Sequence, residues 1–303
     1  MQAGIKIGLK NYQEKILHTK ASICEVHFRY NNLGQYTELF QMLKAKNIKA
    51  GLHFWSMLDG GIMYNLAYPD EKIKRETLDQ LTQTIDLAAQ NKLRYVNIHP
   101  GNLRLVKVDL ERETFTDLGQ EANQEEGLIT LFENASYLTE YAQKRNVLFL
   151  VETVPSRYNP YWYNESTRQN PINVKDPKVA VLINLASNGI YITNDLAHTI
   201  CDEISDDRDF LIKQLIAKTK ALAKQTKLIH VNTTRAPFNG TDTHNGLLAE
   251  DFAQNVIPDR QQIIEILTLF KNRDDVWLIP EPLKDHEKNY LELQKIVRFI
   301  ENS

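Results

Sequence analysis

Eight short segments rich in β-branched and apolar residues recur along the chain, with amphipathic helical stretches between them. The segments are residues 4–9, 22–28, 48–54, 93–99, 147–154, 190–196, 227–232 and 276–280. Between them apolar residues return at helical spacing, as Leu78, Leu81, Ile85 and Ala88 do. Such alternation favours parallel strands joined by right-handed crossovers. Eight units predict an α/β fold of the (β/α)8 or TIM-barrel type rather than an open, doubly wound sheet.

The barrel is expected to form one domain that spans residues 1–303. With 42% apolar and 25% charged residues, the chain has the composition of a globular protein that buries a large core. No linker, short repeat or low-complexity segment divides it. Two connections are long for this fold. Residues 102–120 alternate like an inserted β-hairpin, and residues 155–174 are rich in aromatic side chains.

The overall composition argues against several classes of protein. The net charge of −3 disfavours a surface that binds polyanions over its whole extent, although it leaves room for a local basic rim. Two cysteines, Cys24 and Cys201, make neither a disulfide framework nor a cysteine-based metal site. Residues 1–10 lack the apolar core of a signal peptide, and the longest apolar runs, such as residues 179–185, are far too short for a membrane span. We therefore expect a cytoplasmic protein that does not enter a membrane.

Histidines and carboxylates gather at or just beyond the ends of the predicted strands. In a TIM barrel the C-terminal strand ends meet on one rim, where active sites lie. Imidazole and carboxylate are ligands of Zn²⁺ and related divalent ions, and one ion needs only three or four of them. Nine candidates therefore predict a cluster of metal ions. The nine are His53, His99, Glu152, Asp195, His198, His230, Asp242, His244 and Glu281.

The surroundings of these residues resemble the metal-site motifs of the endonuclease IV family of apurinic/apyrimidinic endonucleases. The matching strings, in order, are HFWS (53–56) followed by YNL (64–66), NIHPG (97–101), VET (151–153), NDLAHT (194–199), IHVN (229–232), DTH (242–244) and PE (280–281). The resemblance implies a TIM barrel with three zinc ions that hydrolyses the phosphodiester 5′ to an abasic site in DNA. Mn²⁺ or Mg²⁺ would be alternative ions.

The resemblance also implies how the ligands are divided among the ions. His53 and His99 would hold one zinc, and Glu152 would bridge it to a second. Asp195, His230 and Glu281 would complete the second site, whereas His198, Asp242 and His244 would hold the third. Clustered divalent ions neutralise the charge of a phosphodiester and stabilise its leaving oxygen. Glu152 and Glu281 are the predicted catalytic residues, since a carboxylate can bind metal with one oxygen and position or deprotonate the attacking water with the other.

Three departures from the family pattern leave the substrate open. After His244 the chain reads NGLLAED instead of a Gly-Glu-Gly turn. Thr233 stands where an acidic residue is common, and the first strand lacks the usual histidine. These positions shape the substrate pocket more than the metal site. The substrate would be DNA, RNA or a small sugar or phosphate compound.

Two other functions fit the same barrel. A sugar isomerase or epimerase of the xylose isomerase-like group would use one divalent ion, for which Glu152, Asp195, His230 and Glu281 would suffice. The number of bound ions distinguishes it from the nuclease. A barrel that has lost catalysis and only binds a sugar or nucleic acid would carry metal without hydrolysis.

Contacts to nucleic acid are expected from loops above the metal rim. Arginine neutralises phosphate, and aromatic rings stack on bases or fill the gap at an abasic site. The candidates are Arg29, Tyr30, Trp55, Arg157, Tyr161, Trp162 and Arg168. The same aromatics would equally serve as a packed lid or a subunit contact. Glu25, His27 and Arg29 share one face of the second strand and predict a buried polar network, while His18 and His286 are expected on the surface.

Overall fold

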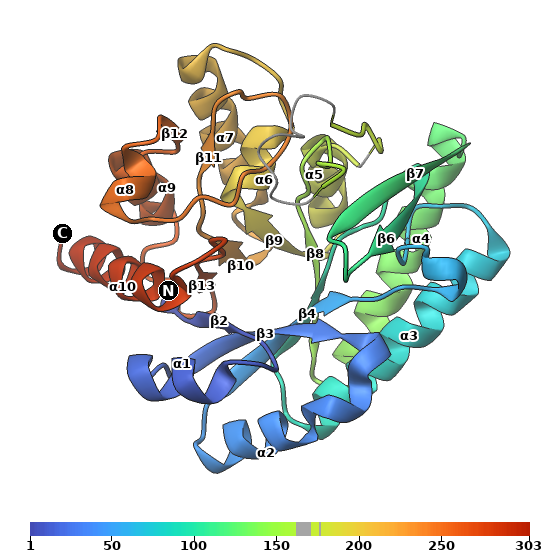
Figure 1. Ribbon diagram of the computed structural model, residues 1–303, viewed down its shortest axis with the longest axis horizontal. Coiled ribbons are helices and arrows are strands. Elements are labelled where there is room, and N and C mark those ends of the chain that lie inside the picture. Colours follow the sequence, from blue (N-terminus) through green and yellow to red (C-terminus); the bar gives the residue numbers. More distant parts are fainter. Residues whose placement is uncertain (162–170, 176) are drawn as a thin grey trace.

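The computed structural model describes residues 1–161, 171–175 and 177–303, which form a barrel of parallel strands surrounded by helices (Figure 1). The barrel strands follow the order β1, β13, β10, β9, β8, β5, β4, β3, β2. Their bounds are Gln2–Ala3 (β1), Ile5–Ile7 (β2), Ile23–Arg29 (β3), Lys49–Trp55 (β4), Tyr95–Ile98 (β5), Leu148–Glu152 (β8), Tyr191–Asp195 (β9), Thr226–His230 (β10) and Trp277–Ile279 (β13). Each predicted segment overlaps one of these strands, and the TIM-barrel prediction is confirmed.

The barrel closes at its first strand, which Gly4 divides into two short pieces. β1 pairs with β13, and β2 pairs with β3, all in parallel. The Gly4 amide still donates to the Leu278 carbonyl at 2.9 Å. A Cβ atom at Gly4 would lie 2.6 Å from Ile23 Cγ2 and 2.7 Å from Ile279 Cδ1. Only glycine therefore lets the chain pass between its two neighbours at this point.

Ten α-helices are present in the described part of the chain, and most of them cover the outside of the barrel (Figure 1). They are Tyr12–Thr19 (α1), Thr37–Ala45 (α2), Glu71–Gln90 (α3), Gln124–Gln143 (α4), Val179–Ser187 (α5), Leu196–Cys201 (α6), Arg208–Leu222 (α7), Ala249–Phe252 (α8), Arg260–Thr268 (α9) and His286–Asn302 (α10). Short 3-10 helices lie at Tyr30–Tyr36 and Asp59–Gly61. The side chains of Asp70, Asn123, Asp207 and Asp259 cap α3, α4, α7 and α9 by accepting backbone N–H bonds in their first turns.

Between β5 and α4 the chain forms an antiparallel hairpin of β6 (Arg104–Asp109) and β7 (Thr114–Glu121). The hairpin lies beside α3 and α4 in Figure 1. The ring of Phe115 stacks on Tyr158 with centroids 4.8 Å apart, which joins the hairpin to the loop after β8. A second antiparallel pair, β11 (Thr234–Arg235) with β12 (Val256–Ile257), lies in the long connection after β10.

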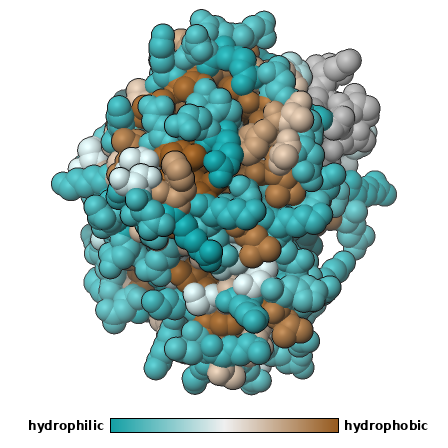
Figure 2. Space-filling model, turned by 90° about the vertical axis from the view of Figure 1, so that its left-hand side faces the viewer, coloured by the Kyte–Doolittle hydropathy of each residue, from teal (hydrophilic) through white to brown (hydrophobic). Residues whose placement is uncertain are grey.

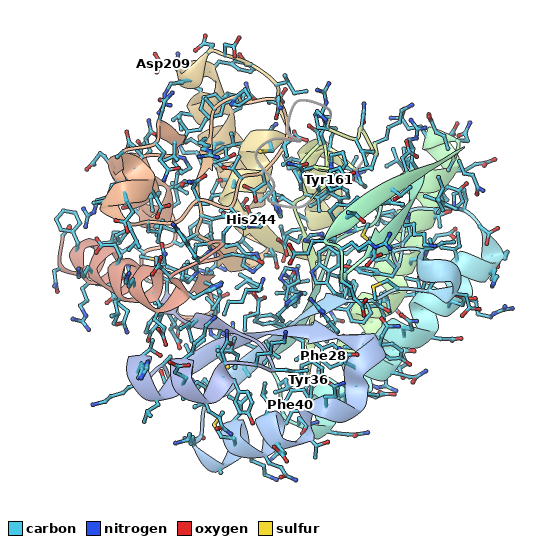
Figure 3. All side chains as sticks on the ribbon, viewed as in Figure 1. Phe28, Tyr36, Phe40, Tyr161, Asp209 and His244 are labelled. Atoms are coloured by element: carbon cyan, nitrogen blue, oxygen red, sulfur yellow. The ribbon has the colours of Figure 1, made fainter. Side chains whose placement is uncertain are left out.

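The apolar core lies mainly between the barrel strands and the helices. Phe28 on β3 packs against Tyr36, and Tyr36 against Phe40 of α2, with ring centroids 4.7 and 5.9 Å apart (Figure 3). Both cysteines, Cys24 and Cys201, are buried and unpaired. On the face that carries α10 the surface is hydrophilic, with smaller apolar areas between the polar ones (Figure 2). No helix in the described part of the chain is long and apolar enough to cross a membrane.

Candidate metal centre

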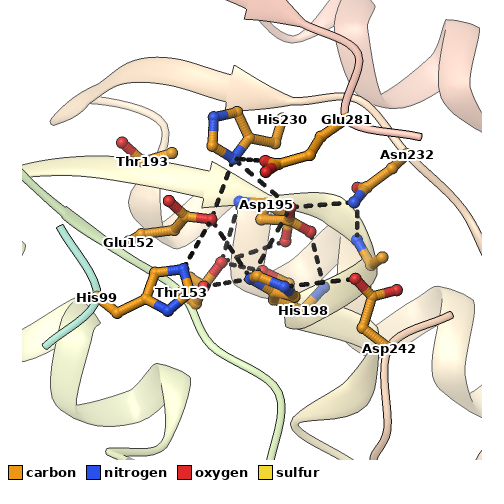
Figure 4. Close-up of polar contacts among 12 residues, drawn as sticks. His99, Glu152, Thr153, Thr193, Asp195, His198, His230, Asn232, Asp242 and Glu281 are labelled. Atoms are coloured by element: carbon orange, nitrogen blue, oxygen red, sulfur yellow. Dashed lines mark hydrogen bonds and ion pairs between the residues drawn. The ribbon is translucent and has the colours of Figure 1, made fainter. Parts of the chain in front are cut away.

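All nine predicted metal ligands lie at one end of the barrel, although up to 228 positions separate them in sequence. Their ligand atoms fall into three groups, in each of which all atoms lie within 4.8 Å of one another. The groups are His53, His99, Glu152; Glu152, Asp195, His230, Glu281; and His198, Asp242, His244. A further group of the same kind joins His53, His230 and Glu281 to Glu25, which was not among the predicted ligands. Figure 4 shows Glu152 between the neighbouring histidines and Asp242 at the far side of His198. The parallel strands bring these residues together, because their C-terminal ends share one rim.

The first group places two imidazoles around one carboxylate. His53 lies on β4, two residues before the end of the strand, and His99 directly follows β5. Their Nε2 atoms lie 3.6 and 3.7 Å from Glu152 Oε2 and Oε1, distances too long for hydrogen bonds. Neither Nε2 atom has another hydrogen-bond partner in the described part of the chain, and both are buried. Buried nitrogens without partners that converge on a carboxylate suit a cation bound between them.

In the second group His230 is surrounded by three carboxylates. Its Nδ1 atom lies 3.0 Å from Glu152 Oε1, 2.8 Å from Glu281 Oε2 and 3.6 Å from Asp195 Oδ2. The amide of Asn97 donates to Glu152 Oε2 at 2.5 Å, and that of Asn232 donates to Asp195 Oδ2 at 3.1 Å. These hydrogen bonds fix the orientation of both carboxylates, as is usual for metal ligands in proteins.

Hydrogen bonds from backbone amides to carboxylates position the ligands of the third group. Asp195 caps the short helix α6, since its Oδ1 accepts from the His198 amide at 2.8 Å, and this directs His198 towards the rim. Asp242 Oδ1 accepts from the His244 amide at 2.8 Å, and His244 takes a left-handed backbone conformation with φ of 44°. Asp242 Oδ2 then lies 3.4 Å from His198 Nε2 and 3.0 Å from His244 Nε2. One carboxylate oxygen thus faces two imidazoles.

An internal ion pair extends the second group towards the first barrel strand. Lys6 on β2 is buried, and its ammonium contacts Glu281 Oε1, His53 Nδ1 and, at 3.4 Å, Glu25 Oε2. Glu25 on β3 is fully buried and lies 2.9 Å from His230 Nε2 through the same oxygen. The hydroxyl of Tyr95 donates to its other oxygen at 3.2 Å. Lys6 therefore partly balances the carboxylates of the rim.

Nearby positive groups lower the pKa values of two carboxylates in the site. Burial favours the neutral acid of Glu152, but His230, His53 and His99 outweigh it and hold the pKa of Glu152 well below its ordinary value. In Glu281, Lys6 and His230 likewise overcome burial and lower the pKa.

The two histidines that face carboxylates behave differently from His53. Burial opposes their protonation, yet Glu152 and Glu25 raise the pKa of His230, and Asp195 and Asp242 raise that of His198, well above 6.5. Burial and the adjacent Lys6 lower the pKa of His53. A metal ion bound by these residues would have to displace the protons on His230 and His198, so its binding would be coupled to pH.

Residues 23–247, most of the chain, match the sequence pattern of one protein family. The chain belongs to the xylose isomerase-like TIM barrel family. This family membership agrees with the barrel and with a rim of histidine and carboxylate side chains. No curated protein matches the sequence.

Solved structures with the same fold include members with different chemistry. A D-tagatose 3-epimerase-like protein superimposes with a TM-score of 0.68 at 16% identity, covering 100% of this chain and 99% of its own. Endonuclease IV from Thermus thermophilus gives 0.60 at 15% identity, with 100% of both chains covered. Another protein of that organism, whose crystal was soaked with zinc chloride, gives 0.61 at 18% identity and covers 99% of each chain. At these identities the similarity shows the fold and does not separate hydrolase from isomerase.

Only some of the predicted substrate-contact residues line one common cavity in this xylose isomerase-like barrel. Arg29, Trp55 and Arg157 line a cavity over the metal rim. Tyr30 instead points to α3, where its hydroxyl donates to Gln83 at 2.8 Å. Tyr161 is 52% exposed and forms a backbone bridge with Thr114 of the hairpin. Trp162 and Arg168 lie outside the described residues.

Several residues of the cavity were not predicted as part of the site. Lys6 and Lys15 line it without having been predicted, and His286, expected on the surface, lines the cavity together with His27. His18 is exposed as expected. A usable signal was present in the first strand, because Lys6 interrupts an otherwise apolar run and pairs in register with Glu25. Charged residues at matching positions of two buried parallel strands indicate that they face each other inside the barrel.

Proposed function

We propose that this protein is a metal-dependent phosphodiesterase that resembles endonuclease IV, binds three divalent ions, mainly zinc, and hydrolyses the phosphodiester 5′ to an abasic site in DNA. One observation carries the proposal, namely that the nine rim residues make up three ligand groups, two of which share Glu152. A single-ion enzyme that used Glu152, Asp195, His230 and Glu281 would leave five ligands without a role. These are His53, His99, His198, Asp242 and His244. Buried ligands that serve no ion are costly, because their desolvated polar atoms lack partners.

The residues of the centre fit metal ions by donor type, burial and spacing. The unpartnered Nε2 atoms of His53 and His99 would hold the first ion with Glu152, and the groups around His230 and Asp242 would hold the other two. When bound, divalent ions neutralise phosphate charge and stabilise the leaving oxygen. Glu152 and Glu281 are the proposed catalytic residues, whose carboxylates would orient the attacking water. Lys6 would keep Glu281 ionised by direct contact.

Metal content and incision activity test the proposal together. Purified protein should carry three divalent ions per chain by elemental analysis and should cut duplex DNA at an abasic site, leaving a 3′-hydroxyl. Glu281→Gln keeps the shape of the side chain but removes its charge, so we expect incision to fall by roughly three orders of magnitude or more, equivalent to about 4 kcal/mol. Glu301→Gln, an exposed position at the end of α10, is the matched control and should leave incision unchanged.

The third ligand group allows a separate test of the ion count. His198→Ala combined with Asp242→Ala removes two of its three ligands, so the variant should carry two ions while the other groups remain filled. Circular dichroism must show an intact fold, since the loss of ligands also affects the loops that carry them. An unchanged ion content in the folded variant would contradict the three-ion assignment.

A second candidate function is a sugar isomerase or epimerase with one ion. Glu152, Asp195, His230 and Glu281 alone form a sufficient four-ligand group, and the similarity to the D-tagatose 3-epimerase-like structure is compatible with it. One tightly bound ion per chain, no incision of abasic duplex and conversion of a ketose or aldose would favour this function. Metal binding without either activity would favour a barrel that only binds its ligand.

A further inference from the structure

The cavity over the metal rim has walls of different chemistry. Its volume is about 810 Å³, and metal-centre residues such as His53, His198 and Glu281 line its floor. Trp55, Leu110, Phe115 and Tyr158 form an apolar side next to the hairpin. The lining next to the first two barrel strands is basic. We call it the basic wall, and it consists of Lys6, Lys10, Lys15, Arg29, His27 and His286.

Four separate elements hold the basic wall in place. Lys15 on α1 donates to the carbonyl oxygen of Lys6 at 3.2 Å, so its ammonium lies next to β2. Arg29 ends β3, where the Tyr36 hydroxyl accepts from the Arg29 amide at 2.8 Å and donates to the His27 carbonyl at 3.1 Å. His286 begins α10. The wall is therefore part of the folded barrel and not a set of loosely held surface lysines.

Of the cations in this wall, Lys6 is paired with Glu281 and Glu25. Among the residues that the structure describes, neither the Arg29 guanidinium nor the Lys15 ammonium forms an ion pair. Burial lowers the pKa of Lys15 to about 8, with Glu287 opposing the shift and Lys6 adding to it. The Nδ1 atom of His286 is buried without a hydrogen-bond partner in the described part of the chain.

We propose that the basic wall binds a second phosphate group of the substrate while the reacting group lies over the metal centre. Guanidinium and ammonium groups form charge-assisted hydrogen bonds to phosphate, and neutral imidazoles add further N–H donors. A substrate without the second anion would leave partly buried cations unpaired next to the metals. The inference rests on the proposed function for the group that reacts, but the wall itself is defined independently of the reaction.

Paired probes that differ by one phosphate test the proposal by isothermal titration of the metal-loaded protein. Thymidine 3′,5′-bisphosphate is compared with thymidine 3′-monophosphate, and fructose 1,6-bisphosphate with fructose 6-phosphate. In at least one pair the bisphosphate should bind about tenfold more tightly to the wild-type protein, since a hydrogen bond to a charged group contributes about 1.5–3 kcal/mol. The pair with the larger ratio shows whether the phosphate belongs to a nucleotide or to a sugar.

Variants that remove a charge test whether the basic wall causes the preference for the bisphosphate. Arg29→Gln and Lys15→Gln should each reduce the ratio towards one, whereas Lys44→Gln, which removes an exposed charge on α2, should keep it. Equal binding within both pairs in the wild type, or an unchanged ratio in both wall variants, would overturn the proposal. Because binding is measured without turnover, absence of phosphodiester hydrolysis would count against the proposed function alone.

Discussion

At the scale of single residues, Glu25 links the metal centre to the interior of the barrel. It lies 2.9 Å from His230 Nε2, while His230 Nδ1 faces the carboxylates of the second ligand group. A histidine that ligates a metal commonly donates its other N–H to a carboxylate, which fixes the ring and makes it more basic. The Tyr95 hydroxyl donates a hydrogen bond to the other oxygen of Glu25. Gly51 leaves room for the Tyr95 ring, since a Cβ atom at position 51 would lie 2.3 Å from Tyr95 Cζ.

We therefore expect Glu25→Gln to weaken binding of one of the ions by about 10–100-fold, since this is the usual effect of removing such a partner. Competition with a chromogenic chelator measures the affinity, and circular dichroism reports the fold. Glu38→Gln, on the exposed face of α2, is the matched control. A purely structural role would lower thermal stability and leave the affinities of all ions unchanged, and that result would refute the assignment.

The same scale shows what the sequence could predict of the site. His53, His99 and Glu281 were identifiable because they stand where apolar strands end, and parallel strands bring such positions to one rim. Lys6 and Lys15 were not identifiable in this way. Lys6 lies inside a strand, and Lys15 reaches the cavity from a helix on the outside, so only the packing of α1 against the barrel places it there.

At the scale of elements, the eight barrel strands were predictable because both faces of each strand are buried, which produces continuous apolar runs. The two-residue strands β11 and β12 gave no such signal, because tertiary contact alone pairs them. Nor did the sequence predict that Gly4 divides the first strand, since this depends on the partners on either side.

Helix α9 provides a stability test at this scale. Asp259 Oδ1 accepts from the Gln262 amide, and the Gln262 side chain accepts from the Asp259 amide, both at 2.8 Å. Asp259→Ala removes this capping box and should lower the free energy of unfolding by about 1 kcal/mol, or the melting temperature by about 2 °C. Asp259→Asn retains an acceptor and should lose less than half of that. Equal losses in the two variants would show that charge, rather than the cap, stabilises the helix.

At the scale of the whole molecule, the apolar core and the titratable side chains lie in different parts of the barrel. Apolar residues fill the space between strands and helices, whereas histidines and carboxylates concentrate at one end. The metal-free protein therefore has a stability whose pH dependence arises largely from this rim. In the unfolded chain the histidines titrate near 6.5.

The signs of the histidine shifts predict where the metal-free protein is most stable. His198 and His230 have raised pKa values, so their contribution is complete below about pH 6.5 and is lost as the pH rises through their folded values. His27, His53 and His286 have lowered pKa values, so folding loses stability as the pH falls below about 6.5. The melting temperature without metal should accordingly be highest near pH 6.5.

Zinc should counteract the loss of thermal stability that the metal-free protein shows above about pH 6.5. Metal binding requires His198 and His230 without the protons that the metal-free site holds, so stabilisation by zinc should grow as the pH rises from about 6 to 8. Differential scanning fluorimetry with excess zinc and with chelator measures both curves. We expect the two melting curves to diverge above about pH 6.5. Without metal, His198 and His230 lose a stabilising proton as the pH rises. With zinc present, the same two deprotonated histidines bind the metal. Parallel curves, or a metal-free protein that becomes steadily more stable up to pH 8, would mean that these histidines neither hold protons in the metal-free site nor bind the ions.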